Sequence, residues 1–188
     1  MCLEWPLALS PVRSAVWLMG SARNAVHHLK YGGWWRAAEA MAQAMIGLDA
    51  VERDSILIPV PLGAARQRAR GYNQSESLAQ ALARLSGALV SNRLLYRRRE
   101  TKTQTGLTPE ARRANTHGAF ATRPDEHRMQ LDGRLVLVDD VFTTGATIVG
   151  AAEALLHAGA RRVEAVTFAR AQRPLDDDVG KLTLTFDS

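Results

Sequence analysis

Two adjacent carboxylates followed by a threonine-rich loop form the segment of this sequence best suited to chemistry. Asp139 and Asp140 come directly after an apolar run, and a short loop separates them from an expected helix. Ligands of open α/β sheets bind beyond the carboxyl ends of the strands, and the free amides of a helix N-terminus favour an anion such as phosphate. The expected phosphate loop consists of Thr143, Thr144, Gly145, Ala146 and Thr147.

The two acids, hereafter the acid pair, point to a different partner from the loop. Carboxylates repel phosphate, so the acid pair suits vicinal hydroxyls or a divalent cation. A phosphate with a diol a few ångströms away is a ribose 5-phosphate. The alternative is an ordinary β-to-α turn with acidic residues, as in Walker-B-type strands. The chain contains no GxxxxGK[ST] loop, which disfavours a nucleoside triphosphatase.

The elements around the acid pair predict an α/β fold. Residues 135–138 are all apolar, as expected for a strand buried on both faces of a parallel sheet. A helical stripe follows and stops at Gly159, and residues 163–168 form the next expected strand. Strand, helix and strand in this order make a βαβ unit. The helical stripe consists of Ile148, Ala152, Leu155 and Leu156.

The rest of the chain gives weaker signals. Helices are expected over residues 21–31 and 34–46, on either side of Gly32 and Gly33, and over residues 75–85. Strands are expected over residues 55–61 and 90–96, with a polar loop over residues 63–74. Residues 97–107 are expected to be a mobile or ligand-gripping loop, before a helix that starts at Thr108.

Composition limits the class of protein. The chain has 188 residues, 46% of them hydrophobic and 23% charged, as expected for one globular domain. Its net charge is +5, and 21 of its 24 basic residues are arginine. This charge fits a phosphorylated ligand or nucleic acid, or a base-composition bias. A single cysteine, Cys2, excludes an internal disulfide. No membrane-spanning stretch or secretory signal is evident, so a cytoplasmic location is expected.

The sequence also resembles a known family. VLVDDVFTTGAT resembles the phosphoribosyl-pyrophosphate (PRPP) signature of type I phosphoribosyltransferases. HHLKYGG, IPVPLGAARQRARGYNQSESLAQALA and TKTQTGLTPEARRANTHGAF are similar to the ComF/GntX family, over residues 26–170. Members usually begin with a four-cysteine zinc module, which is not expected here because only Cys2 is present.

This resemblance implies a type I phosphoribosyltransferase-like parallel sheet flanked by helices, with a small N-terminal hood. The expected single domain divides into a helical hood at residues 1–50, a core at 51–170 and a C-terminal extension at 171–188. The ComF members of the family are linked to natural competence and DNA uptake.

The resemblance also implies roles for individual residues. Asp139 and Asp140 would hold the ribose 2- and 3-hydroxyls, exposed beyond the strand end and outside any ion pair, while the phosphate loop wraps the 5-phosphate. Mg²⁺ is expected to arrive with PRPP, near the acid pair. Pyrophosphate would meet Pro61, Leu62, Gly63 and Arg70, with Gly63 allowing a strained backbone. Lys102, with Gln104, would lie in a loop that closes over the leaving group. His27, His28 and the neighbouring Lys30 receive no role.

Two functions follow. The first is displacement of pyrophosphate from ribose C1 by an unidentified nitrogenous acceptor, which requires no protein nucleophile. The alternative is a non-catalytic nucleotide- or DNA-binding component of DNA uptake, with single-stranded DNA or a competence motor protein as partner.

Overall fold

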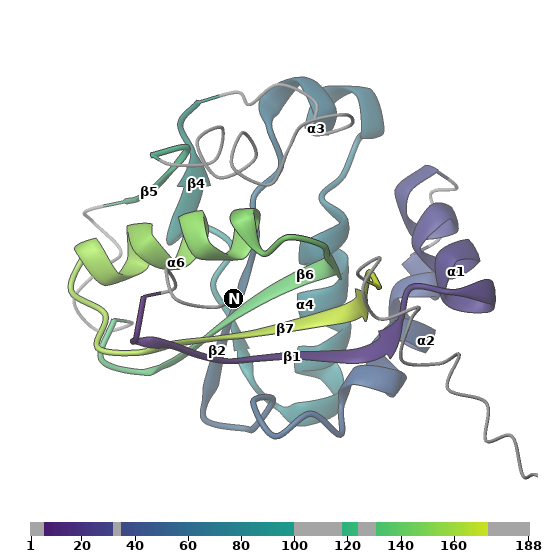
Figure 1. Ribbon diagram of the computed structural model, residues 1–188, viewed down its shortest axis with the longest axis horizontal. Coiled ribbons are helices and arrows are strands. Elements are labelled where there is room, and N and C mark those ends of the chain that lie inside the picture. Colours follow the sequence, from purple (N-terminus) through teal and green to yellow (C-terminus); the bar gives the residue numbers. More distant parts are fainter. Residues whose placement is uncertain (1–5, 32–34, 100–117, 124–130, 173–188) are drawn as a thin grey trace, which may run out of the picture.

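A five-stranded, wholly parallel sheet forms the centre of the molecule (Figure 1). The computed structural model describes residues 6–31, 35–99, 118–123 and 131–172. The strand order is β1-β7-β6-β2-β3, so the strand that carries the acid pair lies in the middle. The strands are β1 (Leu9–Trp17), β2 (Ser55–Pro59), β3 (Leu89–Val90), β6 (Arg134–Phe142) and β7 (Val163–Arg170).

Helices cover both faces of this sheet. In Figure 1, α6 lies in front of the sheet and α4 behind it, while α1 and α2 lie towards the ends of the strand arrows. A short helix, α3, joins β2 to α4, and β4 pairs with β5 in a separate antiparallel ribbon. The bounds are α1 (Gly20–Tyr31), α2 (Trp35–Met45), α3 (Ala64–Arg70), α4 (Gln74–Ser86), α6 (Ala146–His157), β4 (Leu95–Arg97) and β5 (Phe120–Thr122).

Two hydrophobic clusters hold the layers together. One cluster joins α1, α2 and α4 to the sheet through residues such as Leu29, Met41 and Leu82. The other joins α6 to the sheet through Ile148 and Leu155. Strand β6 contributes to both clusters, which explains its continuous apolar run. The predicted α/β class with a parallel sheet flanked by helices is therefore confirmed.

The N-terminal segment differs from the expected helical hood. Strand β1 belongs to the main sheet, where it pairs in parallel with β7, so the sheet begins well before residue 51. Its sequence, LSPVRSAVW, lacks the clear apolar alternation of a strand. Proline and charged residues are tolerated there because β1 is an edge strand. The predicted helices around Gly32 and Gly33 are confirmed as α1 and α2.

Three local predictions also need correction. The strand expected over residues 135–138 continues as β6 to Phe142 and includes the acid pair. The polar loop expected over residues 63–74 contains α3, whose side chains are not buried, and the start of α4. The strand expected over residues 90–96 divides between β3 and β4, which lie in different sheets. The helix expected at Thr108 and most of the 171–188 extension lie outside the described residues.

None of the helices within the described ranges is both long enough and apolar enough to cross a membrane.

Candidate functional site

The acid pair lies inside β6, where the expected exposure is wrong. Asp139 is 8% exposed and Asp140 is 4% exposed. The Oδ1 atom of Asp139 accepts hydrogen bonds from Ser75 Oγ at 2.8 Å and from the Asp140 amide at 2.9 Å. The Nζ atom of Lys30 lies 2.7 Å from Asp140 Oδ2. Ser75 belongs to α4 and Lys30 to α1, so two helices outside the sheet cover the acid pair.

Burial and mutual repulsion dominate the electrostatics of the acid pair. Burial, followed by the negative charge of Asp140, raises the pKa of Asp139 from 3.8 to about 7. The Ser75 hydroxyl, the Asp140 amide and the Lys30 ammonium oppose this rise. The two neighbouring carboxylates thus have few hydrogen-bond donors or cations to offset the cost of burying their charge. A ligand that brings hydroxyl donors would lower the cost of keeping them ionised.

The turn between α3 and α4 positions the donor on Asp139. Asn73 caps α4, because its side chain accepts the Ser75 amide hydrogen and donates to the Val60 carbonyl at the end of β2. The Tyr72 hydroxyl donates to the Leu29 carbonyl in α1. These bonds join α1, β2 and α4 around the end of β6. They fix Ser75 where its hydroxyl reaches Asp139.

The phosphate loop leads directly into α6, as the sequence predicts for the start of this helix. Gly145 has a φ of 80°, in the left-handed region, and α6 begins at the next residue. A residue with a β-carbon is strained in this conformation. The Thr144 hydroxyl lies 3.5 Å from the Ala146 amide, at the limit of a hydrogen bond. Among the described residues, the first amides of α6 therefore have a weak protein partner or none, as an anion site requires.

The segment predicted to meet pyrophosphate runs beside the acid pair. The Val60 amide donates to the Val138 carbonyl at 3.0 Å, which holds the end of β2 next to β6. Pro61 and Leu62 follow, both half-buried. The strained backbone expected at Gly63 is wrong, because its φ of −67° is accessible to any residue. Arg70 donates to Gln74 at 2.7 Å, at the start of α4. Lys102 and Gln104 lie outside the described residues.

The described side chains do not form a metal centre of their own. Within the described residues, no group of three or more His, Cys, Asp or Glu side chains is placed to hold a metal. The open oxygen of Asp140 already faces an ammonium group. Magnesium usually keeps several waters and binds through one or two carboxylates together with the phosphates of a substrate. A magnesium ion here would therefore be held mainly by a phosphate-bearing ligand.

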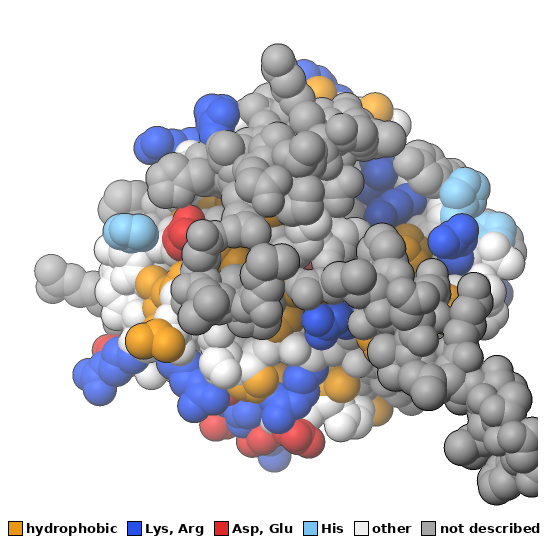
Figure 2. Space-filling view, in the orientation of Figure 1, with side chains coloured by type: hydrophobic (Ala, Val, Ile, Leu, Met, Phe, Trp, Pro, Cys, Tyr) orange, Lys and Arg blue, Asp and Glu red, His pale blue; other side chains and the backbone are white. Residues whose placement is uncertain are grey.

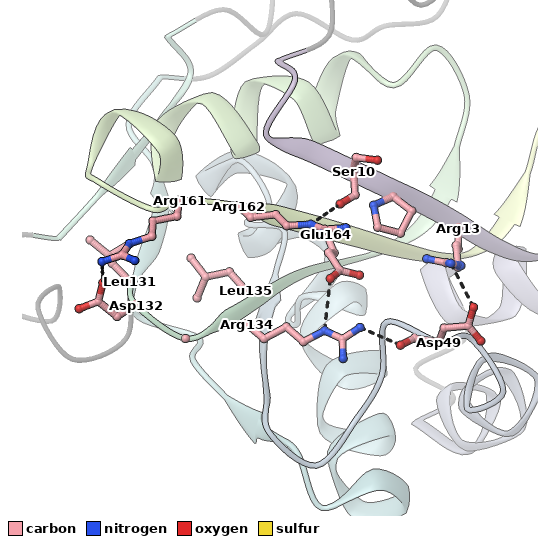
Figure 3. A pocket seen from close by; sticks show the side chains of 12 residues that line it. Ser10, Arg13, Asp49, Leu131, Asp132, Arg134, Leu135, Arg161, Arg162 and Glu164 are labelled. Atoms are coloured by element: carbon pink, nitrogen blue, oxygen red, sulfur yellow. Dashed lines mark hydrogen bonds and ion pairs between the residues drawn. The ribbon is translucent and has the colours of Figure 1, made fainter.

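A hollow lies at the opposite end of the sheet from the acid pair, where β6 and β7 begin (Figure 3). Its volume is about 680 Å³. Arg134 bridges the carboxylates of Glu52, at 2.7 Å, and Glu164, at 3.2 Å, while Arg13 pairs with Asp49. Arg161 lies 3.9 Å from Asp132, and Arg162 donates to the Ser10 carbonyl at 2.9 Å. The arginines that line this hollow therefore all contact protein acceptors, as expected of a structural network.

We expect Arg134→Met to destabilise the fold by about 1–3 kcal/mol, because it leaves the buried carboxylate of Glu164 without its cation. Chemical denaturation of both forms measures this loss. Arg13→Met, which removes an exposed pair with Asp49, is the matched control and should cost less than about 1 kcal/mol. Equal losses in the two variants would contradict the assignment.

The fold and the arrangement at the end of β6 define a type I phosphoribosyltransferase-like protein. The chain belongs to the phosphoribosyl transferase domain family, whose pattern matches residues 38–185. It is 37% identical over 115 residues to competence protein F of Haemophilus influenzae, covering 61% of this chain and 50% of that protein. It is 34% identical over 149 residues to the DNA utilization protein YhgH of Salmonella typhi. This match covers 74% of this chain and 63% of that protein.

A third relative is competence protein ComFC of Bacillus subtilis, 32% identical over 108 residues, which cover 57% of this chain and 41% of that protein. These similarities confirm the resemblance to ComF-family proteins. The chain spans between 41% and 63% of the length of these three relatives.

Two residues at the site had no predicted role. Ser75 was expected only as the first residue of a helix, and Lys30 stood unassigned beside two histidines. The sequence carries no local signal for either contact, because each depends on a strand far along the chain.

Proposed function

We propose that this protein binds PRPP and transfers its phosphoribosyl group to a nitrogenous acceptor, with release of pyrophosphate. The main support for this proposal is that a buried acid pair on β6 lies next to a left-handed glycine turn at the start of α6. The carboxylates can accept hydrogen bonds from the two ribose hydroxyls, and the amides at the start of α6 can bind the phosphate. Together they suit a ribose 5-phosphate group.

The proposed roles follow from these contacts. The amides of the phosphate loop receive the 5-phosphate, where the dipole of α6 favours negative charge. Asp139 and Asp140 accept hydrogen bonds from the ribose hydroxyls. The end of β2 and the residues after it, including Gly63, face the pyrophosphate. Magnesium is proposed to enter with the pyrophosphate, whose charge it would neutralise as it leaves.

In the proposed reaction, the bond between ribose C1 and the pyrophosphate oxygen breaks, and its electron pair departs with pyrophosphate. A nitrogen lone pair of the acceptor forms the new bond to C1, and the acceptor loses its proton. Positive charge develops on the ribose ring in between. The two carboxylates lie on the side of the hydroxyls, where their negative charge stabilises that centre.

The direct test is consumption of Mg²⁺-PRPP with release of pyrophosphate when candidate bases are supplied. Before that, thermal shifts with PRPP, ribose 5-phosphate, nucleotides and single-stranded DNA, each with and without Mg²⁺, identify the ligand class. We expect stabilisation by PRPP and ribose 5-phosphate. Absence of a shift with both compounds at millimolar concentration would contradict the proposal.

The phosphate loop gives a separate prediction. A sulfate or phosphate in a crystal should lie against the amides of residues 144–147, and Gly145→Val should abolish phosphate binding by placing a branched side chain at the turn. Gly159→Val is the matched control, because Gly159 also has a positive φ, of 109°, but lies at the other end of α6. Anions gathering instead around residues 97–99 would assign the phosphate site to another surface.

The relatives' names favour a second candidate, a non-catalytic role in DNA use. Two of those names refer to competence and one to DNA utilization. The net charge of +5 is compatible with DNA contact. On the face drawn in Figure 2, however, Lys and Arg side chains lie in several separate places, some of them beside Asp and Glu. DNA binding predicts an affinity that falls steeply with salt.

A further inference from the structure

The end of α1 brings a cation to the acid pair. Lys30 lies in the last turn of this helix, and its ammonium reaches Asp140 at 2.7 Å. Its neighbour Leu29 is completely buried, and the Leu29 carbonyl accepts a hydrogen bond from Tyr72. The backbone that carries Lys30 is thus anchored on both the core and the α3–α4 turn. The contact with Asp140 therefore belongs to a fixed part of the fold.

The Asp140 carboxylate is otherwise poorly satisfied. Its Oδ2 atom is buried, and among the described residues it has the ion pair with Lys30 but no correctly directed hydrogen bond. A carboxylate accepts about four hydrogen bonds, so this group retains capacity for further donors. Asp139 differs, because its Oδ1 atom already accepts two. Among the described residues, Asp140 is therefore the member of the acid pair with fewer hydrogen bonds from the protein.

Lys30 also differs from the acids in its access to water. Its side chain is 26% exposed, against 6% for the side chain of Asp140. The Lys30 side chain therefore lies between the buried carboxylate and solvent. A lysine stem of four carbons lets the ammonium shift slightly while it stays paired with Asp140.

We propose that Lys30 is a positioning residue for the ribose hydroxyls: it holds the Asp140 carboxylate in the orientation that accepts them. This inference rests on the proposed function, because it assumes that the acid pair meets a diol. It extends the ligand site from β6 to α1, so that the N-terminal segment takes part in recognising the sugar. The phosphate loop, in contrast, acts without Lys30.

The test compares three ligands: ribose 5-phosphate, 2-deoxyribose 5-phosphate and inorganic phosphate. Their affinities are measured by calorimetry for the unaltered protein and for Lys30→Met, which keeps the apolar stem and removes the charge. Arg23→Gln removes a positive charge from an exposed position of the same helix and is the matched control. Lys30→Arg tests rescue by another cation.

We expect Lys30→Met to weaken ribose 5-phosphate by about tenfold and to leave inorganic phosphate unchanged. The unaltered protein should bind 2-deoxyribose 5-phosphate more weakly than ribose 5-phosphate. In Lys30→Met this difference in affinity should be smaller, because Asp140 no longer presents its acceptors correctly. Arg23→Gln should match the unaltered protein, and Lys30→Arg should recover part of the affinity. A purely structural role would instead weaken phosphate and ribose 5-phosphate together.

Three outcomes overturn the proposal. Unchanged affinity for ribose 5-phosphate in Lys30→Met would show that Asp140 needs no cation. Tighter binding would show that Lys30 blocks the site. An equal loss for inorganic phosphate would make the ion pair structural. If the unaltered protein binds inorganic phosphate but neither sugar phosphate, the proposed function itself fails, and this result is distinct from the other three.

Discussion

Asp139→Asn should raise the stability of the ligand-free protein at pH 8 by about 2 kcal/mol, which corresponds to about 4–8 °C in melting temperature. Burial and the charge of Asp140 raise the pKa of Asp139 to about 7, so the folded protein binds this proton more tightly than the unfolded chain does. An Asn side chain carries no charge to desolvate. It also weakens the bonds from Ser75 and the Asp140 amide, which limits the gain.

The effect has a defined pH dependence. The unfolded chain loses the Asp139 proton near pH 4, and the folded protein loses it near pH 7. Between these values the unaltered protein loses stability as the pH rises, and above them the loss is complete. The advantage of Asp139→Asn should therefore grow from pH 5 to pH 8 and then level off.

Melting temperatures measured across this range test the prediction. Asp49→Asn is the control, because the Asp49 side chain is 78% exposed and its ion pair with Arg13 lies at the surface. It should change stability by less than about 1 kcal/mol at either pH. If Asp139→Asn melts below the unaltered protein at pH 8, its carboxylate stabilises the fold and the argument is wrong.

The βαβ unit was predictable because its signals are local. Residues 135–138 form an unbroken apolar run, Ile148 and Leu155 lie on one helical face, and Gly159 ends the helix. Each signal arises from a few neighbouring residues and needs no knowledge of the rest of the chain. The step from the phosphate loop into α6 was predicted in the same way, whereas the positive φ of Gly145 was not. These elements delimit the site.

The elements that were missed depend on distant partners. Strand β1 has a proline and an arginine in its middle, and only its pairing with β7 makes it a strand. The acid pair was expected beyond the strand end because the apolar run stops at Val138. Their burial is possible only because Ser75 and Lys30 supply donors from two other helices. A single lysine on an amphipathic helix gives no sign of such a contact.

The buried acid pair links the stability of the fold to ligand binding. Two carboxylates within β6 cost free energy when the protein is empty, and Ser75 and Lys30 offset only part of this cost. A residue pair selected for stability alone would be apolar at this position, like the residues before it in β6. Retaining two charges in the middle of the sheet is therefore consistent with a ligand that supplies the missing donors.

Replacing both acids by asparagine should weaken ribose 5-phosphate by at least about 100-fold. Each hydrogen bond from a hydroxyl to a charged carboxylate contributes about 1.5–3 kcal/mol, and the double variant Asp139→Asn, Asp140→Asn removes both charges. The fold should persist, because the variant removes two desolvated charges and the partly exposed Lys30 can reach water. Affinity for inorganic phosphate should not fall, because the phosphate loop is intact and two carboxylates that repel phosphate are removed.

Glu164→Gln is the matched control for the double variant. Glu164 is also a buried carboxylate in the main sheet and is also paired with a cation, but it lies at the start of β7, away from the acid pair. If it weakens ribose 5-phosphate as strongly, the effect of the acids is a general loss of stability. If the double variant binds ribose 5-phosphate normally, the ribose does not lie on the acid pair. A selective loss in the double variant alone, with phosphate binding retained, requires that the carboxylates contact the sugar and not the phosphate.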